Sequence, residues 1–117
     1  MEGLDRLERA MQYLRTEVDA EMPAQQVVIL LTVCKEEGIT QHALGERLGM
    51  LGGSVSRNVK SLSQFAVRGA SGNLELKGAG LLDTRPDQEY RLRMAVFLTP
   101  KGKEVIEQLN RIIGGTP

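Results

Sequence analysis

The residues whose types could do chemistry are concentrated in one short stretch, from Ser54 to Ser61. At helical spacing its valines fall on one side, its hydroxyl and basic side chains fall on the other, and Asn58 falls at the flank. Such side chains can read base edges in the DNA major groove and hold phosphates. No Asp or Glu occurs between Glu46 and Glu75, as a phosphate-facing surface requires, although an ordinary solvated helix face is the alternative. The candidate major-groove residues are Ser54, Ser56, Arg57, Asn58, Lys60 and Ser61.

Two further groups of candidate DNA contacts flank this stretch. Gln41 and His42 stand in the first turn of a preceding helix, where side chains and backbone N–H groups can meet a phosphate. The alternative for His42 is an exposed histidine without a role, and a lone histidine is no catalytic signal. Arg85, Arg91 and Arg93 lie on a predicted β-hairpin that can enter the minor groove or grip phosphates.

The acidic residues of this hairpin oppose that role. Asp87 and Glu89 stand at its tip, where they would repel the DNA backbone if the tip were fully inserted. They can instead form local pairs with the arginines. Arg91 and Arg93 are two residues apart, so we expect them to share the outer face of one strand.

The sequence offers no pattern typical of a catalytic or metal site. Cys34 is the only cysteine and has no zinc-binding partners at ligand spacing. It lies in an apolar stretch and is expected to be a small core residue. No nucleophile–base pair and no phosphate-binding loop is present. We therefore expect no enzyme activity, no cofactor and no metal.

Apolar spacing predicts the helices that would position the candidate residues. One helix covers residues 2–19, and a second, over 23–37, is apolar around most of its circumference and is expected to be the core helix. Thr40 is a good N-cap for a short helix over 41–48. A glycine-containing turn separates it from a helix over 53–64, the arrangement of a helix-turn-helix whose second helix is the recognition helix.

After the helix-turn-helix we expect an irregular loop and then a hairpin. Residues 63–79 are rich in Gly, Ala and Ser without a clear period, with at most a short strand at 74–77. Strands at 80–85 and 90–98 flank a tip at 86–89. The predicted buried face of the second strand consists of Tyr90, Leu92, Met94, Val96 and Leu98.

Thr99 is an N-cap and Pro100 a first helical residue, which predicts a last helix over 100–113. The fold class is therefore mainly α with a small β-hairpin wing (α+β), a winged helix-turn-helix. The predicted single domain, residues 1–117, comprises an N-terminal helix at 1–20, the helix-turn-helix at 40–65, the wing at 80–99 and the C-terminal helix at 100–113.

The first and last helices each carry an apolar stripe. Such stripes form either the seam of a homodimer or a contact within one chain, and the sequence favours neither. The candidate dimerisation residues are Leu4, Leu7, Met11, Leu14, Leu109, Ile112 and Ile113.

Composition and charge agree with a soluble DNA-binding protein. The 117 residues carry no net charge, but residues 54–103 hold nine Lys/Arg against four Asp/Glu, while residues 1–53 hold five against nine. A local basic face is what DNA binding needs. The longest apolar run, Val27 to Leu31, is too short to span a membrane, and the acidic N-terminus is unlike a signal peptide. We therefore expect a cytoplasmic protein with no membrane partner.

The chain resembles the MarR-type winged helix-turn-helix regulators. The resemblance rests on Val55-Ser56-Arg57-Asn58-Val59 in the recognition helix, on Gly80-Leu81-Leu82, and on Leu98-Thr99-Pro100-Lys101-Gly102 at the wing-to-helix junction. It implies a dimeric transcription regulator that binds double-stranded DNA. Three features depart from the family pattern: Leu51-Gly52-Gly53 replaces a capping serine, residues 63–79 look like an insertion, and only one helix follows the wing.

Three functions are compatible with the sequence. The first is a sequence-specific, dimeric, DNA-binding transcription regulator. The second is a winged-helix module that binds a protein partner, as an adaptor or as an antagonist of another regulator. The third is a DNA-binding replication or partition factor of a mobile element, which would share the chemistry of the first and differ in its target.

Overall fold

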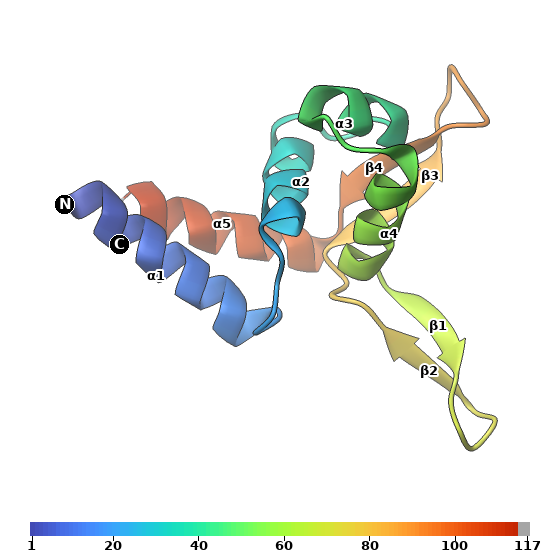
Figure 1. Cartoon of the computed structure of the whole chain (residues 1–117), viewed down its shortest axis with the longest axis horizontal. Helices are drawn as coiled ribbons and strands as arrows, with labels where there is room; N and C mark the ends of the chain where they lie inside the picture. Colours follow the sequence, from blue (N-terminus) through green and yellow to red (C-terminus); the bar gives the residue numbers. More distant parts are fainter. Residues whose placement is uncertain (115–117) are drawn as a thin grey trace.

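The computed structural model describes residues 1–114, and Figure 1 shows its helices and strands. Within that range the chain folds into a helical body from which two β-hairpins project. The elements are α1 (Glu2–Glu17), α2 (Ala24–Lys35), α3 (Gln41–Leu48), α4 (Gly52–Leu62), β1 (Phe65–Arg68), β2 (Leu74–Lys77), β3 (Leu82–Pro86), β4 (Met94–Leu98) and α5 (Pro100–Gly114).

The core is built around α2, as its apolar sequence predicts. Ile29, Leu30 and Val33 of this helix are completely buried. Contacts with α4, α5 and β4 cover its sides. Burying side chains of this size is the main source of stability in a domain of this length.

Helices α1 and α5 lie alongside each other in antiparallel directions (Figure 1). Leu14 of α1 and Leu109 of α5 belong to the buried core and are 1% and 6% exposed. The sequence left open whether the apolar stripes of the first and last helices form a homodimer seam or a contact within one chain. The most buried residues of these stripes are covered within one chain. Leu4, Leu7 and Ile113 remain 58%, 50% and 46% exposed.

The predicted wing is the antiparallel pair β3–β4, with Leu82 opposite Leu98 and Pro86 opposite Met94. The turn between α2 and α3 lies beside β4 and pairs with it. The N–H of Gly38 donates a hydrogen bond to Val96 O at 2.8 Å. Val96 N in turn donates to Ile39 O at 2.9 Å. The wing is thereby fixed to the helix-turn-helix by backbone hydrogen bonds.

The prediction of an irregular loop at 63–79 is wrong, because this segment forms a second β-hairpin. The strand at 74–77 is present, but its partner β1 was missed. Phe65 pairs with Lys77 and Arg68 with Leu74. Every residue of β2 is exposed, so burial imposes no alternation of apolar and polar residues that a sequence reading could detect.

The second wing strand is shorter than predicted, because Tyr90 to Arg93 belong to the turn. The Asp87 carboxylate accepts hydrogen bonds from the backbone N–H groups of Glu89 and Tyr90, at 3.1 and 2.9 Å. This local bonding competes with strand pairing. Tyr90 is therefore 55% exposed and Leu92 fully exposed, and the prediction that they belong to a buried face is wrong.

Several helix ends differ slightly from the expectation. Pro23 is the N-cap of α2 and lies outside the helix, and α4 begins at Gly52 behind Leu51. The short helix α3 has the predicted bounds, and the Thr40 hydroxyl accepts the N–H of Ala43 at 3.1 Å. Cys34 is only half-buried and lines an apolar groove between α2 and α5, so its assignment to the core is wrong.

Candidate nucleic-acid interface

Helices α3 and α4 form the predicted helix-turn-helix. Helix α4 turns Val55, Val59 and Leu62 inward, where all three are buried. The turn is tight: a Cβ added at Gly45 would lie 2.9 Å from Met50 O. This close approach holds α3 against the start of α4, the arrangement in which one helix braces the other on DNA.

The outer face of α4 is polar and basic. Ser56, Arg57, Lys60 and Ser61 are exposed, while Ser54 is half-buried. Within residues 1–114 the Arg57 guanidinium makes no hydrogen bond or ion pair with the chain. A guanidinium that has no such partner and lies on the exposed face of a helix can bind a guanine edge or a phosphate.

Asn58 has a different position from the other candidates. Gln26 Nε2 of α2 donates to Asn58 Oδ1 at 3.2 Å, and Asn58 Nδ2 donates to Ser54 O at 2.8 Å. Both ends of this amide are therefore occupied within the chain. Asn58 joins α4 to α2 and has little hydrogen-bonding capacity left for a base.

Gln41 and His42 lie in the first turn of α3, as predicted. Gln41 is half-buried. The His42 side chain is 53% exposed, and its Nε2 lies 2.8 Å from Glu46 Oε1 one turn further along the helix. A carboxylate so close weakens the attraction of this histidine for a phosphate.

Two of the three wing arginines, Arg85 and Arg93, lie over aromatic rings. The Arg85 guanidinium stacks 4.0 Å from the centre of the Phe97 ring, and Arg93 lies 4.8 Å from that of Tyr90. Arg91 and Arg93 stand in the wing turn rather than on a strand, so the predicted shared strand face is wrong. All three arginines are exposed and present positive charge at the wing.

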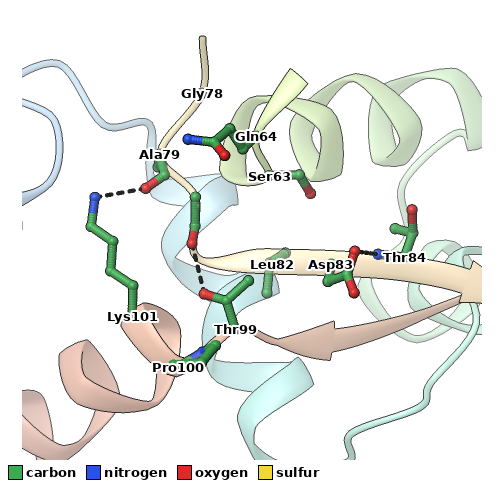
Figure 2. A pocket seen from close by; sticks show the side chains of 11 residues that line it. Ser63, Gln64, Gly78, Ala79, Leu82, Asp83, Thr84, Thr99, Pro100 and Lys101 are labelled. Carbon is green, nitrogen blue, oxygen red and sulfur yellow. Dashed lines mark hydrogen bonds between the residues drawn. The ribbon is translucent and has the colours of Figure 1, made fainter. Parts of the chain in front are cut away.

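A polar pocket of about 520 Å³ lies where the two hairpins meet α5 (Figure 2). Lys101 Nζ donates to Ala79 O at 2.9 Å, and the Thr99 hydroxyl donates to Gly80 O at 2.6 Å. Thr99 Oγ1 also accepts the N–H of Gly102 at 3.0 Å, which caps α5. These bonds anchor the linker between the hairpins, and we assign the pocket no ligand.

Sequence reasoning missed the basic residues of the second hairpin. Arg68 and Lys77 are exposed on β1 and β2. Lys60 Nζ lies 4.8 Å from the centre of the Phe65 ring, so the hairpin base continues the outer face of α4. The gap in carboxylates before Glu75 was the available signal, since it extends well beyond the recognition helix.

The fold is a winged helix-turn-helix whose second helix has a polar and basic outer face. Residues 20–64 match the model of the MarR family. The resemblance to MarR-type regulators is thus confirmed over the helix-turn-helix by sequence and over the described chain by fold. Among curated proteins, none matches the sequence.

Several solved structures share this fold. A structure of MarR is 20% identical, with a TM-score of 0.64 over 95% of this chain and 67% of that one. A mutant MarR from E. coli complexed with operator DNA is 19% identical, with a TM-score of 0.62 over 94% of this chain and 69% of that one. The PcaV transcriptional regulator from Streptomyces coelicolor, in complex with its natural ligand, is 25% identical, with a TM-score of 0.56 over 97% and 77%.

Within residues 1–114, the search for a helix long and apolar enough to cross a membrane found none.

Proposed function

We propose that this protein is a sequence-specific transcription regulator that binds double-stranded DNA as a homodimer. Helix α4 lies in the major groove and the β3–β4 wing contacts the neighbouring backbone or minor groove. The observation that carries the proposal is the outer face of α4, which combines Arg57, Lys60 and Ser61 with no carboxylate. The operator complex of the similar MarR structure supports the same use of the fold.

The decisive experiment selects binding sites from a random duplex library at several salt concentrations. We expect an enriched palindromic site, because a two-fold dimer reads two half-sites about one helical turn apart. Affinity should fall steeply with salt, since phosphate contacts release counterions. Absence of duplex binding even at low salt would overturn the proposal.

Arg57→Ala provides the matched test of the recognition helix. Loss of one guanidinium that binds a base edge costs about 1–3 kcal/mol of discrimination at a single position of the site. Thr16→Ala, at an exposed position of α1, is the control and should leave the selected site unchanged. An Arg57→Ala protein that selects the wild-type site with wild-type affinity would exclude Arg57 from base recognition.

The dimer part of the proposal rests on exposed apolar residues. Leu4 and Leu7 are exposed on α1, and Ile113 on α5 lines an apolar groove together with Leu31 and Ile106. A surface of this kind favours association with a second copy. Sedimentation equilibrium should show a dimer for the wild type and a monomer for Leu7→Glu. A wild type that is monomeric at tens of micromolar would contradict the dimer.

A further inference from the structure

We propose that the β1–β2 hairpin, residues 65–77, is a second DNA-contacting arm whose tip and Arg68 enter the minor groove beyond the C-terminal end of α4. This inference rests on the DNA-binding function proposed above. It gives a role to the segment that separates the recognition helix from the wing.

The position of the hairpin is the first argument. It starts three residues after α4 ends, and it projects from the body on the opposite side of α4 from the wing tip (Figure 1). The Lys60 ammonium, on the outer face of α4, lies over the Phe65 ring of β1. Lys77 stands directly opposite Phe65 in the strand register. The recognition face therefore continues onto the hairpin base.

The charge of this continuous surface is the second argument. Residues 54–82 contain four basic side chains and one carboxylate, Glu75. Glu75 Oε2 lies 3.8 Å from Lys77 Nζ, and both side chains are more than half exposed. A solvated pair of this kind binds weakly and releases its lysine to a phosphate at little cost. Positive charge next to the recognition helix is complementary to the phosphates of duplex DNA.

The shape of the tip is the third argument. The strands are joined by Gly69-Ala70-Ser71-Gly72-Asn73, and the first four of these residues have no side chain larger than serine. A tip of this size suits the minor groove of B-DNA, which is about 6 Å wide. Arg68 stands directly behind the turn and donates to Gly72 O. An arginine held at a narrow tip is suited to the strong negative potential of a narrow minor groove.

The exposed leucines of β2 suggest an alternative in which the hairpin binds a protein instead of DNA. Leu74 and Leu76 are 68% and 66% exposed on the same face of the hairpin. A protein partner would bury them, whereas the charge and the small tip favour DNA. The variants must therefore separate the basic residues from the leucines.

The test uses the full chain and the selected operator with native flanks. Salt-dependent affinity and hydroxyl-radical footprints are compared for wild type, Arg68→Ala/Lys77→Ala, Glu75→Gln and Leu74→Ser/Leu76→Ser. For the double basic variant we expect a salt slope flatter by about 2 and loss of protection in one minor groove outside each half-site. Glu75→Gln should bind more tightly than wild type. The leucine variant should keep the wild-type slope and footprint.

The outcomes distinguish this inference from the proposed function. If wild type binds the operator and Arg68→Ala/Lys77→Ala has the same slope and footprint, the arm does not contact DNA, while the function of α4 stands. If only the leucine variant loses binding, together with a change in sedimentation, the hairpin acts through protein association and the inference is overturned. Failure of wild type to bind any duplex overturns both.

Discussion

The side-chain amide of Gln26 in α2 donates to the side-chain oxygen of Asn58 in α4, over 3.2 Å. Gln26 is 9% exposed and is a buried polar residue beside the apolar core. The recognition helix is thus held to the central helix by a polar bond next to its apolar contacts. This relationship makes Asn58 a residue that positions α4.

We therefore expect Asn58→Ala to lower the free energy of unfolding without changing the DNA sequence that is selected. Loss of the partner leaves the Gln26 amide unsatisfied, which costs about 1–3 kcal/mol. Urea unfolding measures the first effect and duplex selection the second. In Gln26→Ala/Asn58→Ala the two losses should not add, since the residues share one bond. A changed selected site would mean that Asn58 reads a base.

Leu51→Ser is expected to stabilise the protein. Leu51 is the N-cap of α4, is 83% exposed and makes no side-chain cap bond. A serine hydroxyl at this position can accept a free N–H of the first turn, which contributes about 1 kcal/mol. Thermal unfolding is the measurement, and Leu51→Ala is the control that offers no acceptor. Equal melting temperatures for the two variants would show that the first turn is satisfied in another way.

Gly102→Ala is expected to destabilise the junction between the wing and α5. A Cβ at this position would lie 2.2 Å from Leu81 O, which belongs to the backbone and cannot rotate away. Overpacking of this kind costs about 1–3 kcal/mol. Gly3→Ala is the matched control, because nothing lies within 4 Å of a Cβ there and alanine favours α1 by a few tenths to about 1 kcal/mol. Denaturant unfolding should show opposite signs for the two variants.

The pH dependence of the unfolding free energy of Tyr13→Phe tests the contact between α1 and α5. Burial, followed by the charges of Glu17 and Glu104, raises the pKa of Tyr13 above its ordinary value of 10.0. Tyr13 is therefore neutral in both states only well below pH 10. Above it the unfolded chain ionises first, so stability falls as the pH rises through the folded-state pKa.

Tyr13→Phe should lack that part of the alkaline decline, and Glu104→Gln should reduce it. Unfolding free energies between pH 8 and pH 11 check both. Identical pH profiles for wild type and Tyr13→Phe would show that the phenol is fully solvated, contrary to its packing between α1 and α5.

The sequence by itself determined the elements with strong local signals. Thr40 and the apolar spacing after it predicted α3 with its observed bounds. The Thr99-Pro100 pair located the start of α5, and Val55 with Val59 identified the buried side of α4. These signals work because caps and helical periodicity depend on residues only a few positions apart.

Only the tertiary structure decided the features that depend on distant residues. The β1–β2 hairpin has an exposed strand without alternation enforced by burial, so its pairing was not visible in sequence. The position of Asn58 depends on Gln26, 32 residues earlier. Burial of Leu14 and Leu109 between α1 and α5 likewise depends on how the two ends of the chain meet. A stripe of apolar residues shows that a helix must be covered, and the fold decides which surface covers it.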